Sequence, residues 1–213
     1  MSAQKPELKV SVFSDYICPF CYIGSRRLMR LDRTYDLKVN WAGLEIHPET
    51  PPEGMPIERL GYPKQQWTQM MAALTEMAAE EGIEMESHDF TTNSHKALLL
   101  AEAAKHAGRE SFYALHERLF HEFFSQGKNI GDEQVLRTIA CEAGVPESIV
   151  DVAWRNQDYE QRLKLNLQHA QELGVRGTPT FVFGQELLVG AVPLADLEAA
   201  AARASRPVDT GQL

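Results

Sequence analysis

The pattern of hydrophobic and polar positions divides the chain into three stretches. In the first, residues 8–14 and 39–46 alternate as strands do, and residues 25–35 between them carry apolar side chains at helical spacing. This stretch predicts a β-α-β unit with parallel strands, because a helical crossover joins strands that run in the same direction. From residue 63 to residue 157 the pattern is helical throughout.

The third stretch returns to a mixed pattern. Residues 159–173 predict a long helix, and two short apolar runs within residues 181–189 flank Gly184 and Gln185. A Gly-X pair between short apolar runs is typical of a β-hairpin. Residues 195–204 predict a closing amphipathic helix.

Together the three stretches predict an α/β fold with a four-stranded mixed sheet. We expect residues 8–50 and 158–204 to form one discontinuous domain around this sheet. Residues 63–157 are expected to form a large all-helical insertion. Residues 205–213 are expected to form a flexible polar tail.

Composition limits the classes of protein to consider. The chain has 213 residues, of which 44% are hydrophobic and 24% charged, and its formal net charge is −9. This charge argues against nucleic acid or an anionic membrane as a partner. No window approaches the roughly 18 apolar residues of a membrane span, and the polar N-terminus carries no apolar signal segment. With only three cysteines, these features predict a cytoplasmic protein.

One cysteine pair stands at the first junction between strand and helix. Cys18 and Cys21 are three residues apart, so on a first helical turn their sulfurs come within disulfide reach. Pro19 fits that turn, where its missing N–H costs nothing. The positive end of the helix dipole favours a thiolate at Cys18, and a thiolate is the species that attacks a disulfide. We expect Cys18 to be the more exposed sulfur and the reactive one.

A zinc site and a structural disulfide are the other interpretations of such a pair. Zinc takes four ligands, yet the only other cysteine is Cys141, and no histidine pair follows at zinc-finger spacing. At helical spacing Cys141 points away from the apolar face of its own helix, so we expect no part for it in the chemistry. We therefore predict no metal. A short-range structural disulfide is disfavoured by the expected reducing compartment.

A proline begins the strand run near the C-terminus. Pro179 follows Gly177 and Thr178 and cannot donate a hydrogen bond to a sheet. It is compatible with an edge-strand start, a plain trans turn, or a cis peptide in a tight turn. The cysteine pair at the other end of the same α/β unit favours the cis peptide.

Two segments resemble a known family. Residues 13–24, which contain the cysteine pair, and residues 174–181, which contain the proline, are similar to the FrnE subfamily of the DsbA-like thiol–disulfide oxidoreductases. The resemblance extends over residues 8–204. It implies a thioredoxin fold that carries a helical insertion, and a protein of a mostly cytoplasmic branch.

The resemblance also implies roles for individual residues. Cys18 would be the nucleophile and Cys21 the resolving thiol. Thr178 and cis-Pro179 would form a wall that faces the substrate beside them. An extended substrate could pair with the backbone of Thr178 as an added strand while its disulfide faces Cys18.

The chain departs from the better-known relatives near the cysteines. In thioredoxin and DsbA an acid lies six residues before the first cysteine, and here that position is Val12. Asp15, three residues before Cys18, suits either helix capping or catalytic support. Pro19 and Phe20 separate the cysteines and belong to the expected substrate-binding set. Because Phe20 is neither charged nor a hydrogen-bond donor, we expect a weaker oxidant than the periplasmic relatives.

The remaining histidines are interpreted as structural or stay unassigned. His116 and His121 lie on or beside an aromatic helix face without metal-ligand spacing. His47 lies in a proline-rich loop that could line a substrate cleft. His95 matches a position that is often histidine in the subfamily, without an assigned role.

The favoured function is a dithiol–disulfide oxidoreductase or isomerase that uses the Cys18–Cys21 disulfide. Its partners would be proteins or small molecules that carry disulfides or dithiols. It would need no cofactor beyond its own disulfide, with glutathione as a candidate co-substrate. Its oligomeric state, monomer or homodimer, stays open.

Two other classes are weighed against it. A glutathione-dependent transferase or isomerase, like the kappa-class glutathione transferases and the hydroxychromene carboxylate isomerases, normally has serine in place of Cys18 and needs no second thiol. A non-catalytic binding module or chaperone would keep its activity after loss of both thiols.

Overall fold

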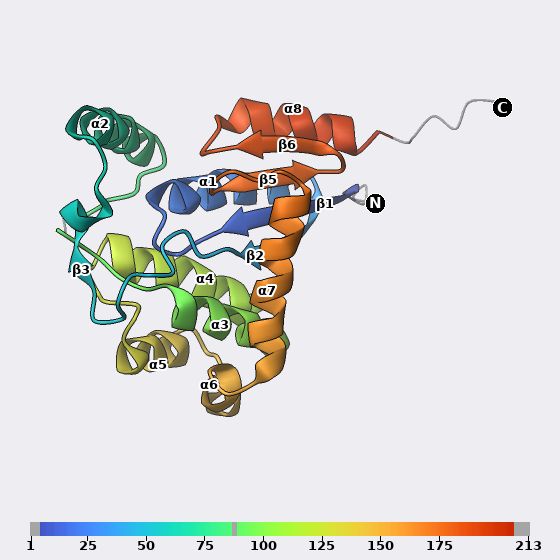
Figure 1. Cartoon of the computed structure of the whole chain (residues 1–213). Helices are drawn as coiled ribbons and strands as arrows, with labels where there is room; N and C mark the ends of the chain where they lie inside the picture. Colours follow the sequence, from blue (N-terminus) through green and yellow to red (C-terminus); the bar gives the residue numbers. More distant parts are fainter. Residues whose placement is uncertain (1–4, 87–88, 207–213) are drawn as a thin grey trace.

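The fold is centred on a four-stranded sheet with the strand order β2-β1-β5-β6 (Figure 1). The computed structural model describes residues 5–86 and 89–206. The strands are β1 (Glu7–Ser14), β2 (Asp36–Gly43), β5 (Thr180–Phe183) and β6 (Glu186–Val189). β1 pairs in parallel with β2 and antiparallel with β5, and β5 pairs antiparallel with β6. The predicted mixed sheet and C-terminal hairpin are confirmed.

Helices cover both faces of this sheet. The three helices that do so are α1 (Pro19–Met29), α7 (Gln157–Glu172) and α8 (Leu194–Ala204). In Figure 1, α7 crosses in front of the strands, and α1 lies behind them. Phe13 and Val182 pack with Ala170 of α7 on one face, while Val12 and Phe181, which alternate with them, pack in the main core. This alternation is the strand pattern that the sequence predicted.

The segment between β2 and α7 is mostly helical. Its helices are α2 (Lys64–Glu80), α3 (His95–Ala104), α4 (Arg109–Phe124), α5 (Glu133–Glu142) and α6 (Glu147–Ala153). Asp132 begins α5 by accepting hydrogen bonds from the N–H groups of Gln134 and Val135, as a helix N-cap does. The segment also holds a two-stranded sheet that the sequence did not predict, formed by β3 (Met55–Pro56) and β4 (Phe90–Thr91). In Figure 1, α3, α4, α5 and α6 gather below the main sheet, and α2 stands apart.

Three short 3₁₀ helices, Arg30–Arg33, Ile57–Leu60 and Lys105–Ala107, complete the described elements. No described helix is long and apolar enough to cross a membrane. The division into a sheet domain and an insertion domain stays a prediction. Most of the predicted tail lies outside the described residues.

The first helix begins earlier than its apolar spacing predicted. It starts at Pro19, and beyond Met29 the chain tightens into the first of the 3₁₀ helices, so residues 25–35 are only partly α-helical. The reason is burial on several sides: residues 21–25 of α1 are all buried. A segment buried all round shows no amphipathic period, so the pattern could not locate the helix start.

Candidate active site

The end of β1 and the start of α1 place the cysteine pair. β1 ends at Ser14, and Cys18 occupies the N-cap position of α1 with extended backbone geometry. Pro19 follows in the first turn, as predicted. The N–H of Cys21 donates to the carbonyl oxygen of Cys18 at 3.0 Å. Both sulfurs therefore lie at the positive end of the helix dipole.

Strand β5 brings the second half of the site to the first. Phe13 on β1 pairs with Thr180 on β5, so the turn before β5 lies beside the loop after β1. The Thr178–Pro179 peptide bond is cis, which confirms the predicted geometry. The thiol of Cys18 donates to the carbonyl oxygen of Thr178 at 3.4 Å. Residues 160 positions apart in sequence thus meet at one sulfur.

Gly24 allows α1 to approach this turn closely. A Cβ added at Gly24 would lie 3.1 Å from Cγ of Pro179 and 2.9 Å from Cζ of Phe181. Side chains essentially never pack at the shorter distance, so a larger residue would push α1 away from β5. A glycine in the middle of a helix costs stability, and here it brings Pro179 next to the helix that carries the cysteines.

The two sulfurs differ in proton affinity more than in exposure. Cys18 is 5% exposed and Cys21 1%, so Cys18 is the more exposed of the two, as predicted, but both side chains are buried. A hydrogen bond from the Cys21 thiol, helped by the Thr178 side chain, lowers the pKa of Cys18. Burial, followed by the neighbouring Cys18 sulfur, raises the pKa of Cys21 well above its usual value. The thiolate therefore forms at Cys18.

Asp15 is buried beside the pair but does not cap the helix. Its Oδ2 accepts from the N–H of Ile46 at 2.8 Å, and its Oδ1 accepts from the N–H of Ile17 at 3.4 Å. The capping interpretation is therefore wrong, since Cys18 holds the N-cap position. Burial raises the pKa of Asp15 to about 6, although a hydrogen bond with Ser94 opposes the rise. Its backbone N–H lies 3.5 Å from the sulfur of Cys21.

His116 contacts the active-site loop from the helical segment. Its Nδ1 lies 2.9 Å from the hydroxyl of Tyr16, and its Nε2 lies 2.9 Å from the hydroxyl of Ser25. Burial lowers the pKa of His116 to about 3, so the ring is neutral. Sequence reasoning placed His116 on a helix face and missed both contacts. Only its position among buried aromatic residues gave a signal, because a buried histidine needs hydrogen-bond partners.

An exposed aromatic side chain lies near Cys18. The pKa of Tyr62 is raised by partial burial and by the negative charge of Cys18. The Tyr62 hydroxyl lies 3.4 Å from Nε2 of His47, and its ring lies 6.1 Å from that of Trp67. The structure thus places His47 next to Tyr62, a residue that the sequence did not single out. Phe20 is only half-buried.

Within the part of the chain that the structure describes, His95 and Cys141 form no hydrogen bond or ion pair with the cysteine pair or the cis-proline turn. His95 pairs through Nδ1 with Glu45 at 3.0 Å and through Nε2 with Glu160 at 2.9 Å. Cys141 is exposed on α5, whose buried face it does not share, as predicted. Among the described residues, no group of three or more His, Cys, Asp or Glu side chains could hold a metal ion.

Comparison with known families decides the identity of this fold. Residues 9–202 match the DsbA-like thioredoxin domain family. The chain belongs to this family. The match covers the sheet, the cysteine pair, the cis-proline turn and the helical segment, and it confirms the predicted thioredoxin-like fold.

Solved structures with the DsbA-like fold are similar over nearly the whole chain. The probable DsbA oxidoreductase SCO1869 from Streptomyces coelicolor is 21% identical with a TM-score of 0.83, over 97% of this chain and 94% of that one. A 2-hydroxychromene-2-carboxylate isomerase is 20% identical, with a TM-score of 0.71 over 92% and 95%. The cytosolic disulfide reductase DsbM from Pseudomonas aeruginosa, solved with glutathione, is 18% identical, with a TM-score of 0.67 over 92% and 96%. At these identities the likeness concerns the fold.

Proposed function

We propose that the chain is a protein-disulfide oxidoreductase or isomerase that acts through a Cys18–Cys21 pair, in the FrnE branch of the DsbA-like family. The observation that carries the proposal is the placement of both cysteines at the start of α1, with the Cys18 thiol against the turn before β5. Their surroundings shift the two thiol pKa values in opposite directions. One sulfur is prepared to attack and the other holds its proton until it is needed.

In the first step the Cys18 thiolate attacks one sulfur of a substrate disulfide. A bond forms between Cys18 and that sulfur, and the other substrate sulfur leaves as a thiolate. Attack requires an extended substrate to approach the Thr178–Pro179 turn, where Pro19 and Phe20 flank the reacting sulfur. The carbonyl oxygen of Thr178 can accept a hydrogen bond from the substrate backbone as β-augmentation does.

In the second step Cys21 resolves the mixed disulfide. The Cys21 thiol loses its proton and attacks the Cys18 sulfur, which forms the Cys18–Cys21 disulfide and releases the second substrate thiolate. The substrate gains two electrons, and the cysteine pair loses two. Asp15 is our candidate for the base, because its buried carboxyl is close enough to raise the pKa of Cys18 and its own pKa is raised to about 6. An external dithiol, or two molecules of glutathione, would return the pair to its reduced form.

The proposal is tested by insulin reduction with three single variants, each followed by intact-mass analysis. We expect Cys18→Ser to abolish reduction and Cys21→Ala to accumulate covalent adducts through Cys18. Cys141→Ser, an exposed thiol away from the site, should retain the wild-type rate. Reduction that survives in Cys18→Ser would contradict the proposal.

A glutathione-dependent isomerase or transferase is the second candidate, because the hydroxychromene carboxylate isomerase shares the fold. It differs in needing one thiol or hydroxyl rather than two. Full activity of Cys21→Ala with glutathione would favour this candidate. Substrate identity, direction of electron flow and a cytoplasmic location belong to the proposal, and the low cysteine count supports the location.

A further inference from the structure

A groove separate from the cysteine pair lies along the edge of the sheet. Its volume is about 820 Å³, which is within the range of small-molecule sites. Its walls come from β1, β2, the 3₁₀ helix before α4, α4 itself, the end of α7 and the β5–β6 hairpin, and they include neither cysteine nor the cis-proline turn. Leu173 and Val182 contribute apolar surface to it, on the face of the sheet that packs against α7.

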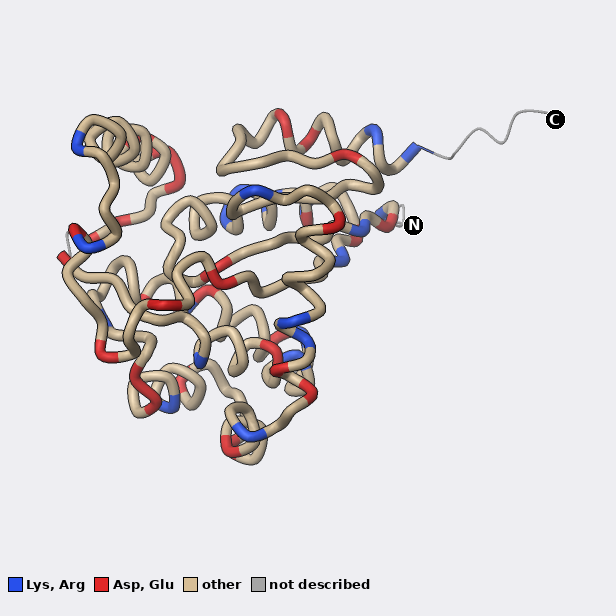
Figure 2. Tube along the Cα trace, in the orientation of Figure 1, with Lys and Arg blue, Asp and Glu red and all other residues tan. Residues whose placement is uncertain are grey.

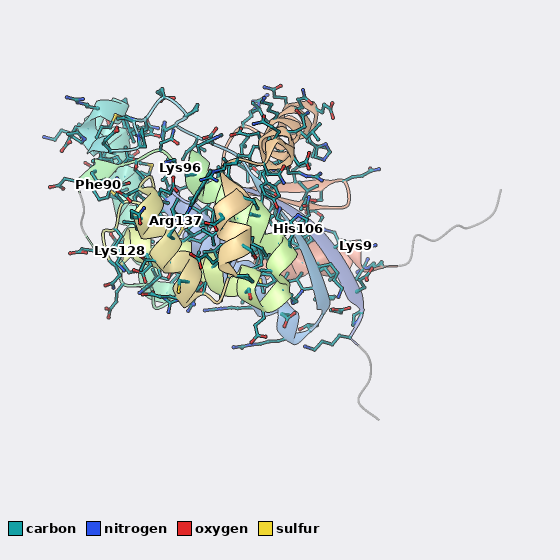
Figure 3. The ribbon with its side chains drawn as sticks, turned by 90° about the horizontal axis from the view of Figure 1, so that it is seen from below. Lys9, Phe90, Lys96, His106, Lys128 and Arg137 are labelled. Carbon is teal, nitrogen blue, oxygen red and sulfur yellow. The ribbon has the colours of Figure 1, made fainter. Side chains whose placement is uncertain are left out.

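The charge of this groove is opposite to that of the chain. The chain carries 30 acidic and 21 basic residues. Four basic side chains line the groove, and none of its described lining residues is Asp or Glu. They are Lys9, Lys38, Lys105 and Arg109. In Figure 2 basic segments gather at the end of the sheet near the N-terminus, and in Figure 3 Lys9 lies at this end of the strands.

Two of these lysines lie directly opposite each other on neighbouring strands. Lys9 on β1 is in register with Lys38 on β2, and Glu7 is in register with Asp36. Like charges are thus paired with like charges at both positions. The two lysines are therefore neighbours on one face of the parallel strand pair, where an anion between their ammonium groups could contact both.

The other two basic side chains are held against the edge strand. Nζ of Lys105 donates to the carbonyl oxygen of Trp41 at 2.7 Å, and Nη1 of Arg109 donates to that of Leu37 at 3.1 Å. The Arg109 guanidinium also stacks on the ring of Tyr113, with its carbon 4.9 Å from the ring centre. Their positions are therefore fixed before any ligand arrives.

Each of the four basic side chains of the groove has an acidic partner, and the strength of that pairing decides whether the cation can also bind a ligand. Lys9 and Lys38 each pair with the acid two residues earlier on the same strand, and Arg109 pairs with Asp32 at 3.4 Å. These three pairs are exposed, and exposed pairs contribute little, so Lys9 and Lys38 can turn towards an anion at small cost. The guanidinium of Arg109 stays where Leu37 and Tyr113 hold it and meets the anion from the side. Lys105 differs because its partner is a buried glutamate at 2.7 Å. The available charge comes from the first three.

We propose that this groove binds a small organic anion with an aromatic or apolar body. The anionic group lies between Lys9 and Lys38, with Arg109 at the side, and the body lies against Leu173 and Val182, which line the groove on the same face of the sheet as the two lysines. This site is independent of the disulfide chemistry proposed above.

The test uses two fluorescent probes and two matched double variants. Anilinonaphthalene sulfonate carries an aromatic body and one negative charge, and phenylnaphthylamine has nearly the same rings without the charge. Lys9→Gln/Lys38→Gln removes the opposed pair. Arg155→Gln/Lys164→Gln removes the same total charge at exposed positions outside the groove. Titrations are run on the full chain, with urea unfolding to check that each variant is folded.

We expect one sulfonate per chain, with affinity about tenfold weaker in the groove variant and unchanged in the control variant. The uncharged probe should bind weakly to all proteins. A Cys18→Ser/Cys21→Ser protein should bind the sulfonate as the wild type does, whatever the fate of the oxidoreductase proposal. Equal binding of both probes would mean a merely apolar surface, and equal weakening in both variants would mean non-specific charge attraction. Either result overturns the proposal.

Discussion

At the scale of single residues, the chemistry depends on what each sulfur touches. Cys18 accepts a hydrogen bond from the Cys21 thiol and is helped by the Thr178 side chain, and these contacts stabilise its anion. Cys21 is enclosed and lies next to that anion, so its own ionisation is opposed twice. The nucleophile is thus defined by hydrogen bonds within a buried pair, since both side chains are almost inaccessible.

This difference predicts the order of alkylation. In the reduced protein Cys18 should react with iodoacetamide at a lower pH than Cys21, because the thiolate reacts and the pKa of Cys18 is the lowered one. Peptide mapping after timed alkylation over a pH series measures both sites. Exposed Cys141 serves as an internal reference thiol. Earlier reaction at Cys21 would reverse the assignment of the two roles.

Asp15→Asn should change the two thiols in different ways. The Asp15 carboxylate raises the pKa of Cys18, so its removal should lower that pKa in the alkylation series. Loss of the proposed base should slow resolution by Cys21 and lengthen the lifetime of the mixed disulfide. In the wild type, resolution should accelerate as pH rises through about 6, where Asp15 ionises. Unchanged resolution in Asp15→Asn would remove Asp15 from the mechanism.

The same substitution should stabilise the fold. Because the pKa of Asp15 rises from 3.8 to about 6 on folding, the native state binds the proton more tightly. The contribution of Asp15 to stability therefore falls as pH increases from about 4 to 6. At pH 7 Asp15→Asn should unfold with a free energy higher by up to about 3 kcal/mol. Urea unfolding at pH 4 and 7 measures this, and an equal difference at both values would contradict it.

At the scale of elements, α4 is bound to the active-site loop through one neutral ring. His116 bridges Tyr16, before the cysteines, and Ser25, after them. A neutral imidazole has one donor and one acceptor nitrogen, so it can satisfy two hydroxyls of opposite role. The position of the cysteine turn therefore depends on a helix about a hundred residues later in the chain.

His116→Phe should reduce both stability and activity. The ring volume stays similar, but two buried hydroxyls lose their partner, at about 1–3 kcal/mol each. We expect a loss of about 2–4 kcal/mol in urea unfolding, together with slower insulin reduction. The matched control is His116→Phe in a Tyr16→Phe/Ser25→Ala background, where no hydroxyl remains to be satisfied. An equal cost in both backgrounds would mean that His116 acts through packing alone.

The sequence predicted those elements that bury one face and expose the other, or that carry a turn or capping signal. The strands, the hairpin and the capped helix α5 follow from alternation, a Gly-X pair and Asp132. The start of α1 did not follow from the pattern, because burial on several sides removes the alternation of apolar and polar residues at helical spacing. In the site, the C-x-x-C motif and Pro179 were visible as motifs. His116 and Tyr62 were not, because their roles arise from tertiary contacts with residues far away in the sequence.

At the scale of the whole molecule, the ion pairs of one histidine join three segments that lie far apart in the sequence. His95 at the start of α3 lies between Glu45, after β2, and Glu160 on α7. Hydrogen bonds with the two carboxylates, first of all that with Glu45, raise the pKa of His95 to about 9. At neutral pH the ring is therefore an imidazolium that connects the sheet, the helical segment and the long helix α7.

Stability should consequently fall at alkaline pH through His95. Its pKa rises from 6.5 to about 9 on folding, so its contribution is complete below about pH 6.5 and is lost as pH rises through about 9. The side chain is 34% exposed, and after solvent screening we expect about 1 kcal/mol. His95→Gln should therefore be less stable than the wild type in urea unfolding at pH 6, and the difference should vanish near pH 10. His169→Gln, at an exposed pair with Glu172, is the control and should stay within a few tenths of a kcal/mol of the wild type. A His95→Gln difference that does not change with pH would show that the ring packs between the segments without carrying a charge.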